Sequence, residues 1–375
     1  MDSKDLTLMA VGDIVLIDDN PKELFDLVAP VLQTGDVVIA HSEIPFTSNK
    51  IVSYARSGFG HMPNPASNPK NINILKDVGF NVATTASNHA WDSGVAGVED
   101  SINGLREAGF DTVGMGMNLE EARKPAIIDN KGSRIGILNY NCTGPEISYA
   151  NSIKPGCAYV HIVTSYEVNE PCPGATPTIY TFPEPRSFSA MKDDIRKLRS
   201  DCEVLVVKFH KGIGFVPYKL AMYEQLISHA AIDAGADLVL GEHAHILKGI
   251  EQYKGKIIFH GLGNFVSSFA DFPKEQMAEH RRMIKELYSI ESDADDPSKH
   301  YHPEASHTMI AKCTIRDGKI VKVGYIPCTI NDKNQPEPLK HDERGQKVFD
   351  YVVEISRKAG LEANFEWDGD EVVIT

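Results

Sequence analysis

The chain has 375 residues, six scattered cysteines and a formal net charge of −14 at pH 7. This length is sufficient for one large domain with its own core, and the absence of Cys-x-x-Cys pairs argues against a disulfide scaffold or a zinc knuckle. The acidic balance excludes nucleic acid as the expected partner, because binding its backbone requires clustered Lys and Arg. An anionic substrate stays open if a bound metal supplies positive charge.

The first half of the chain alternates between strand-like and helix-like patterns. Two β-like runs, at 6–11 and 36–40, are separated by apolar residues at helical spacing between 21 and 32. The alternation continues with a helix at 71–78, a strand at 81–85, a helix at 95–108, and strands around 112–113 and 134–140. This order indicates an α/β fold with helices on both faces of a sheet.

The second half contains two stretches without a clear period, 143–187 and 272–307, which we interpret as insertions. Between them the pattern predicts helices at 189–199 and 219–234 and strands at 203–209, 238–241 and 257–260. A hairpin turned at Asp317-Gly318, a helix at 346–359 and a strand pair within 364–374 follow. We expect a main domain at 1–338 and a C-terminal helix and strand extension at 339–375.

No apolar run is long enough for a membrane span, and the acidic first residues do not fit a signal peptide. We therefore expect a cytoplasmic protein without a membrane partner. The sequence does not specify its oligomeric state.

Side chains suited to metal binding follow five of the predicted strands. They are Asp13, Glu43, Asn88 with the adjacent His89, His210, and His243 with His245. Ligands of α/β sheets bind where the carboxyl ends of the strands converge, so these side chains are predicted to form one site at one sheet edge. If the segment 243–245 is extended, its two histidines point to the same side.

Each of these residues also has a purely structural interpretation. Asp13 is a favoured helix cap, Asn88 a common turn residue, and His210 by itself more often a core histidine. Their combination favours a metal site, because caps and core histidines have no reason to fall at successive strand ends. Imidazole and carboxylate ligands suit zinc, manganese or iron, and a carboxylate bridging two ions is typical of hydrolytic sites.

Five ordered segments resemble the CapA-like family, which is named for poly-γ-glutamate capsule synthesis and is similar to the calcineurin-like metallophosphoesterases. They are GDIVL at 12–16, SEIP at 42–45, the run 79–127, VVKFHKG at 206–212, and the run 231–265. The resemblance extends from about residue 6 to residue 338. It implies an α/β, metallophosphoesterase-like layered sandwich of β-sheet flanked by helices, with insertions and a C-terminal β-rich extension.

The resemblance also implies a binuclear site and roles for single residues. Two divalent transition metal ions are expected, the first bound by Asp13, Glu43 and His245, and the second by Glu43, Asn88, His210 and His243. His89 is expected to give a proton to the leaving group or to stabilise the transition state, with Asp92 orienting it. Asn264 lines the site or serves as a turn residue.

Several positions depart from the family pattern. Val15 stands where phosphoesterases have a histidine, which leaves the first metal one ligand fewer. Glu242 stands where a further histidine is frequent, His260 where an aromatic residue is common, and His61 where an arginine is expected. We assign His61, Glu242, His260 and Asn264 to substrate binding. Without the arginine, the case for a phosphate substrate is weaker.

The leading hypothesis is a metal-dependent hydrolase that uses a metal-activated water on an ester, amide or phosphoester bond of a small molecule or γ-glutamyl compound. The alternative is a non-catalytic protein that binds metal or a metabolite and assists poly-γ-glutamate or capsule synthesis. The aromatic residues of 143–187 are expected either to shape a substrate pocket or to pack on the sheet edge; they are Tyr149, Tyr159, His161, Tyr166, Tyr180 and Phe182. We interpret His280, His300, His302 and His307 as part of a solvated loop rather than a further metal cluster.

Overall fold

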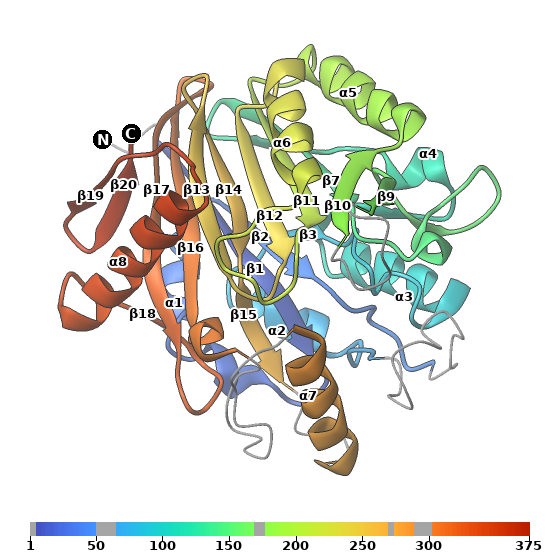
Figure 1. Ribbon diagram of the computed structural model, residues 1–375, viewed down its shortest axis with the longest axis horizontal. Helices are drawn as coiled ribbons and strands as arrows, with labels where there is room; N and C mark the ends of the chain where they lie inside the picture. The colour runs from blue at the N-terminus through green and yellow to red at the C-terminus, as the bar shows by residue number, and fades with distance from the viewer. Residues whose placement is uncertain (1–4, 50–64, 169–176, 269–273, 289–301) are drawn as a thin grey trace.

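The structure is a computed structural model that describes residues 5–49, 65–168, 177–268, 274–288 and 302–375. Two β-sheets face one another, and helices cover their outer faces (Figure 1). The predicted α/β sandwich of β-sheet flanked by helices is therefore confirmed. Within these residues no helix is both long and apolar enough to cross a membrane.

The larger sheet is built around β1 (Leu6–Leu16). This strand pairs in parallel with β2 (Val37–Ser42) and β15 (Asn264–Ser268), and antiparallel with β16 (His307–Arg316). The sheet continues beyond β2 through β3 (Val82–Thr84) and β4 (Asp111–Val113), and beyond β16 through β17 (Lys319–Ile330), β20 (Glu371–Ile374) and β19 (Phe365–Asp368). The short β18 (Pro336–Pro338) also pairs with β17. The predicted hairpin at Asp317-Gly318 is confirmed.

The smaller sheet carries the other half of the predicted site. Its strands lie in the order β13 (Leu247–Tyr253), β14 (Lys256–Leu262), β12 (Leu238–His243), β11 (Val204–Lys211), β7 (Ser133–Asn141) and β6 (Ala126–Asn130). The inner four are parallel, and β13 and β6 are antiparallel edges. The strands that bear the predicted ligands thus belong to two facing sheets, not to one sheet as the sequence led us to expect.

Alternation along the strands separates three apolar layers. Val204 and Val206 of β11 pack between the sheets, whereas Leu205 and Val207 pack under the helices α5 (Pro185–Arg199) and α6 (Met222–Ala234). The outer face of the larger sheet is covered by η1 (Lys22–Phe25), α1 (Ala29–Leu32), α2 (Asn71–Asp77) and α3 (Gly94–Glu107). Successive residues of a strand therefore face different layers. A polar side chain points either between the two sheets or toward the covering helices, according to its position in the strand.

Some sequence predictions of local structure were wrong. The helix expected over 21–32 is a 3₁₀ turn followed by the short α1, because Pro30 has no N–H to donate and its ring disfavours a continuous helix. Strands β6, β13 and β15 were missed. The stretch 143–187 is not irregular throughout, since it contains η3 (Glu146–Ser148), a short β8 (Gly156–Cys157) paired with β5 (Met115–Gly116), and the hairpin of β9 (Ile162–Glu167) and β10 (Thr178–Pro183).

The remaining helices lie at the margins of the sandwich. The short α4 (Leu119–Ala122) precedes β6, α7 (Lys274–Tyr288) lies within the second predicted insertion, and η4 (Pro303–Ser306) precedes β16. In the extension 339–375, α8 (Glu343–Lys358) packs on the core between the sheets, and β20 pairs with β17. The extension is therefore continuous with the larger sheet.

Candidate metal centre

Predicted ligands from both sheets meet between the carboxyl ends of their strands. Asp13 and Glu43 come from the β1 and β2 side, while His210 and His243 come from β11 and β12. Asp13 and Glu43 are buried, and His210 is fully buried. The site is therefore a cluster of titratable groups enclosed between two sheets.

Asp13 lies inside β1 rather than after it, at a position where the strand is irregular. The register of β1 shifts beside this residue on both of its parallel neighbours, β2 and β15. A side chain is excluded at the preceding Gly12, because a Cβ there would lie 1.9 Å from the carbonyl oxygen of Gly263. The bulge directs the Asp13 carboxylate toward β12, where it accepts from the backbone N–H of His243 at 3.1 Å.

One group of ligand atoms surrounds Nε2 of His210. It lies 2.6 Å from Oδ1 of Asn88 and 3.1 Å from Nδ1 of His243. Oε1 of Glu43 is 3.9 Å away. Burial, followed by the neighbouring His243 and His41, lowers the pKa of His210 well below its usual value. A neutral imidazole is the form that binds metal.

A second group brings together Asp13, Glu43 and His245. Nδ1 of His245 is 3.6 Å from Oδ2 of Asp13, and its Nε2 is 3.3 Å from Oε1 of Glu43. Both groups can hold a metal ion, since one ligand atom from each residue lies within 4.8 Å of the others. Glu43 belongs to both groups, as a bridging carboxylate does.

Glu43 itself tests whether a cation fits. Both of its carboxylate oxygens are buried, and neither accepts a hydrogen bond within the described part of the chain. Burial raises the pKa of Asp13 well above its usual value, and the charges of Glu43 and Glu242 raise it further. Buried carboxylates that lack donors are costly unless a cation neutralises them, so the donor set fits divalent metal ions.

His243 and His245 reach the centre through unusual backbone rather than through an extended segment. Their φ angles are 87° and 55°, in the left-handed region that side chains disfavour. The prediction of an extended pair was wrong, although both rings still approach the cluster. Phe215 stacks on His245 with ring centroids 5.5 Å apart. Such strain, about 1–3 kcal/mol per residue, is characteristic of functional sites.

His89 lies at the edge of the cluster. Its Nδ1 is 2.5 Å from Oδ2 of Asp92, and its Nε2 is 3.8 Å from Oε1 of Glu43. The ring is 12% exposed, whereas Asp92 is buried. Ser87 fixes the turn, since its hydroxyl accepts from the N–H of His89 and donates to the carbonyl of Glu43. One ring nitrogen is thus held by a carboxylate while the other faces the centre.

The four residues assigned to substrate binding lie in different places. Oδ1 of Asn264 is 2.8 Å from Nδ1 of His245, so Asn264 joins the cluster. Glu242 and His260 are fully buried and contact protein side chains. His61 lies outside the described residues. Substrate binding by these four stays a prediction.

His41 contacts the cluster and was missed by the sequence analysis. It is fully buried, and its Nε2 lies 3.0 Å from Nδ1 of His210. The signal was available: Val37 and Ile39 of β2 face the core between the sheets, and period-two alternation places residue 41 on the same face. His41 was not predicted because it lies within β2 and not after the end of a strand.

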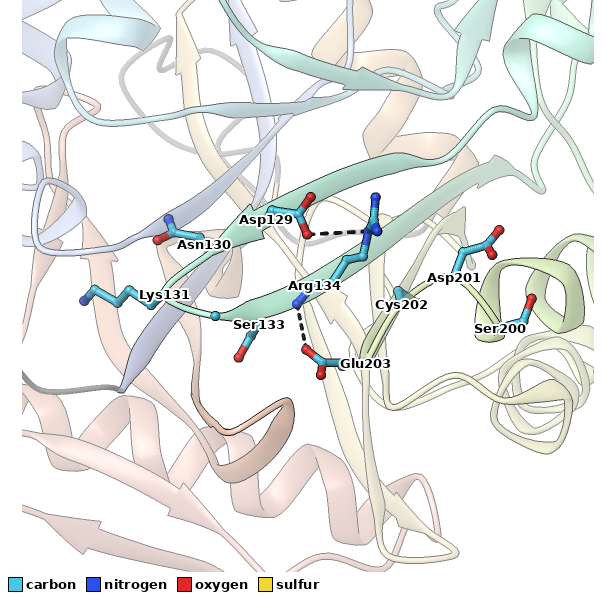
Figure 2. Close-up of a pocket in the computed structure, with 10 residues that line it drawn as sticks. Asp129, Asn130, Lys131, Ser133, Arg134, Ser200, Asp201, Cys202 and Glu203 are labelled. Carbon is cyan, nitrogen blue, oxygen red and sulfur yellow. Dashed lines mark hydrogen bonds and ion pairs between the residues drawn. The ribbon is translucent and has the colours of Figure 1, made fainter.

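A pocket of about 530 Å³ lies at the opposite ends of β7 and β11 (Figure 2). Two of its cations are already engaged, Arg134 with Asp129 at 3.5 Å and Lys131 with Asp36 at 2.9 Å. None of the predicted site residues lines it. The predicted site residues therefore lie at the other end of the sheet, away from this pocket.

The His-rich stretch is only partly described. Nδ1 of His302 accepts from the N–H of Glu304, and Nε2 of His307 pairs with the same glutamate at 3.3 Å. His300 and the side chain of His280 lie outside the description. Neither His302 nor His307 belongs to a group of potential metal ligands in the described chain.

Comparison with known proteins relates most of the chain to capsule synthesis proteins. A family model described as "Bacterial capsule synthesis protein PGA_cap" matches residues 7–268. "PGA biosynthesis protein CapA" of Bacillus subtilis is 29% identical over 65% of this chain and 56% of its own length. "Capsule biosynthesis protein CapA" of Bacillus anthracis is 27% identical over 71% and 60%. The chain thus spans less than two thirds of both relatives.

Among solved structures, the chain resembles the calcineurin-like phosphoesterase YfkN of Bacillus subtilis. The TM-score is 0.34 at 12% sequence identity, covering 95% of this chain and 97% of that one.

Proposed function

The chain belongs to the PGA_cap family of bacterial capsule synthesis proteins, as its sequence resemblance predicted, and from that premise we propose that it is a metal-dependent hydrolase. The observation that carries this proposal is Glu43. Its carboxylate is buried, accepts no hydrogen bond within the described residues, and lies between His210 of β11 and His245 of the turn after β12. A group in that state suits the bridging of two cations.

Two divalent ions, of zinc, manganese or iron, would occupy the centre. Asp13, Glu43 and His245 would hold the first, and Glu43, Asn88, His210 and His243 the second. When bound, such ions supply Lewis-acid activation of the substrate and of water. The protein holds the ligand side chains in fixed, buried positions, where charge interactions are stronger than in solvent.

His89 would supply the proton that the leaving group needs. Asp92 holds its Nδ1, so that Nε2 is the nitrogen directed to the reacting bond. An alkoxide or amine leaving group departs more easily when protonated, and a positioned acid of this kind contributes about 10²–10⁴-fold to the rate. The slight exposure of the ring fits a group that meets substrate.

For the substrate we propose an amide or ester of a γ-glutamyl compound. The names of the two relatives concern PGA and capsule biosynthesis. A γ-glutamyl substrate would give the present chain a related role. The metal chemistry serves carbonyl and phosphoryl compounds alike, so the choice of bond needs a direct test.

The test combines metal content with turnover. Plasma mass spectrometry of the purified chain is expected to find about two equivalents of transition metal. We expect His245→Ala to lose one equivalent and His210→Ala the other. His89→Asn should keep the metal and lose about 10²–10⁴-fold in kcat on matched γ-glutamyl amide and phosphoester panels.

The other outcomes separate the hypotheses. Full metal content without turnover on either panel would favour the non-catalytic binding protein. A chain that takes up no metal even after reconstitution would rule out the hydrolase.

A further inference from the structure

A line of buried side chains leads from the metal centre into the layer between the sheets. His41 of β2 lies 3.0 Å from His210 through its Nε2. Its Nδ1 lies 2.9 Å from Oε1 of Glu242 and 3.0 Å from Oγ1 of Thr84. Behind them, Nζ of Lys208 is 3.3 Å from Oε1 of Glu242. His41, Glu242 and Lys208 are fully buried, so these contacts exclude water.

The neighbours of His41 determine which of its nitrogens carries the proton. The Thr84 hydroxyl donates to the carbonyl of Ala40 at 3.1 Å, and therefore it accepts from His41. The Glu242 carboxylate, 2.9 Å from Nδ1 of His41, has no proton to offer it. Both partners lie at Nδ1, which therefore carries a proton, and when that proton is the only one on the ring, Nε2 offers its lone pair to His210.

This proton placement fixes His210 in turn. If Nε2 of His41 accepts, Nδ1 of His210 must donate, and the lone pair of His210 lies on Nε2. That nitrogen faces Oδ1 of Asn88 at 2.6 Å, which is also an acceptor. Two acceptors at this distance repel each other unless a cation lies between them.

We propose that His41 is a positioning residue that holds His210 in the metal-binding tautomer, with Glu242 and Lys208 anchoring His41 from behind. The inference rests on the metal centre of the proposed function but assigns a role that the sequence did not give to His41. It also gives Glu242 a role beneath the centre. Partners of this kind orient a ligand and raise its basicity, and their loss typically costs about 10–100-fold in metal affinity.

Direct ligation by His41 is the competing arrangement, since one ligand atom each from Asp13, His41 and His210 lies within 4.8 Å of the others. A metal in that position would need the lone pair of His210 on Nδ1. A neutral imidazole has only one lone pair, so the group of Glu43, His210 and His243 would then lose its histidine at residue 210. The hydrogen-bonded arrangement keeps that group complete.

The test measures Zn²⁺ affinity of the metal-stripped full chain by calorimetry. His41→Phe is expected to weaken binding by about 10–100-fold. His41→Gln should recover most of the affinity, because its side-chain carbonyl can accept from Nδ1 of His210. His229→Phe is the control, since His229 is a partly buried histidine that pairs with Glu251 outside the centre. It should bind Zn²⁺ as the wild type does.

Two results would overturn the inference: unchanged affinity in a folded His41→Phe chain, or equal losses in His41→Phe and His41→Gln with fewer zinc equivalents, which would indicate direct ligation. Should His41→Phe fail to fold, Glu242→Gln replaces it, with an expected loss of about tenfold. Unchanged affinity in that variant would overturn the inference equally.

Histidine ¹⁵N NMR of the metal-free wild type separates this inference from the proposed function. A proton on Nδ1 of His210 supports the positioning role, and a proton on Nε2 overturns it. Neither result depends on whether the chain turns over any substrate.

Discussion

Two buried clusters of similar composition lie on opposite faces of the smaller sheet. His210 and Lys211 are consecutive on β11, and alternation directs the first into the metal centre and the second toward α6. There Lys211 joins what we call the ion-pair network, made of Lys211, Glu224, Lys248, Glu251 and His260. Both clusters contain buried histidine and glutamate, but they differ in how their polar atoms are satisfied.

In the ion-pair network, donors face acceptors. Nζ of Lys211 lies 2.9 Å from Nδ1 of His260, whose Nε2 is 2.9 Å from Oε2 of Glu251. Glu224 lies between Lys211 at 3.7 Å and Lys248 at 3.9 Å. Lys248 also donates to the carbonyl of Lys219 at 2.6 Å.

In the metal centre, the proposed tautomer of His210 places acceptor against acceptor. Oδ1 of Asn88 then faces the lone pair on Nε2 of His210, and neither Glu43 oxygen accepts a hydrogen bond within the described residues. In the network, Oε2 of Glu224 accepts no hydrogen bond but has the Lys211 cation beside it, whereas in the centre no lysine or arginine contacts Glu43 within the described residues. The comparison teaches that residue type does not distinguish a structural cluster from a ligand site, but the balance of donors and acceptors does.

The largest difference between the two clusters is expected in Zn²⁺ affinity, when one carboxylate is removed from each cluster. Glu43→Gln takes away the ligand shared by both metal groups, so Zn²⁺ affinity should fall by more than the roughly 10–100-fold that an outer partner costs. Glu251→Gln is the matched change in the network and should leave affinity unaltered. Calorimetric titration of both metal-stripped variants measures this. Equal affinities for the two would remove the distinction between the clusters.

For the free energy of unfolding, a carboxylate of the ion-pair network is expected to have a large effect. Glu224→Gln keeps the hydrogen bond to the N–H of Ala221 but leaves the buried Lys211 and Lys248 without their shared anion. Breaking a buried ion pair in this way costs about 3–5 kcal/mol in the free energy of unfolding. Urea titration with EDTA present measures it without metal linkage. Glu343→Gln, which removes an exposed helical pair with Lys347, should give no resolvable change.

The sequence predicted which side chains lie close together, because residue type and strand position agree there. Asp13, Glu43, Asn88, His210, His243 and His245 all approach one another, as expected from strand ends. The sequence did not reveal that the strands form two facing sheets, because local periodicity records burial and not which strands pair. It also missed β13, because the buried Lys248 interrupts the apolar pattern of that strand.

His41 and the backbone at His243 were missed for different reasons. His41 lies within a strand, where a core histidine is the ordinary interpretation, and only its contact with His210 marks it. The positive φ of His243 arises because β12 ends there and tertiary contacts hold the turn. No residue-level signal predicts a left-handed histidine.

The network should also give stability a pH dependence. Burial, followed by the charge of Lys211, lowers the pKa of His260 to about 4. The unfolded chain therefore binds a proton between about pH 6.5 and 4 that the native chain does not, and stability falls as the pH falls through this window. The expected total is about 3 kcal/mol. Urea titrations from pH 7 to 4 should show a shallower fall in His260→Gln than in the wild type. The exposed His341→Gln should follow the wild type.

The smallest effect is expected at a hydrogen bond that orients a predicted metal ligand. Oδ1 of Asn264 lies 2.8 Å from Nδ1 of His245 and is predicted to accept its proton, so that Nε2 faces Glu43. Asn264→Ala removes this acceptor and should weaken Zn²⁺ binding by about tenfold, the lower end for an outer partner. Asn264→Asp restores an acceptor and should bind at least as well as the wild type. If both variants weaken binding equally, Asn264 acts as a turn residue, and its carbonyl does not orient His245.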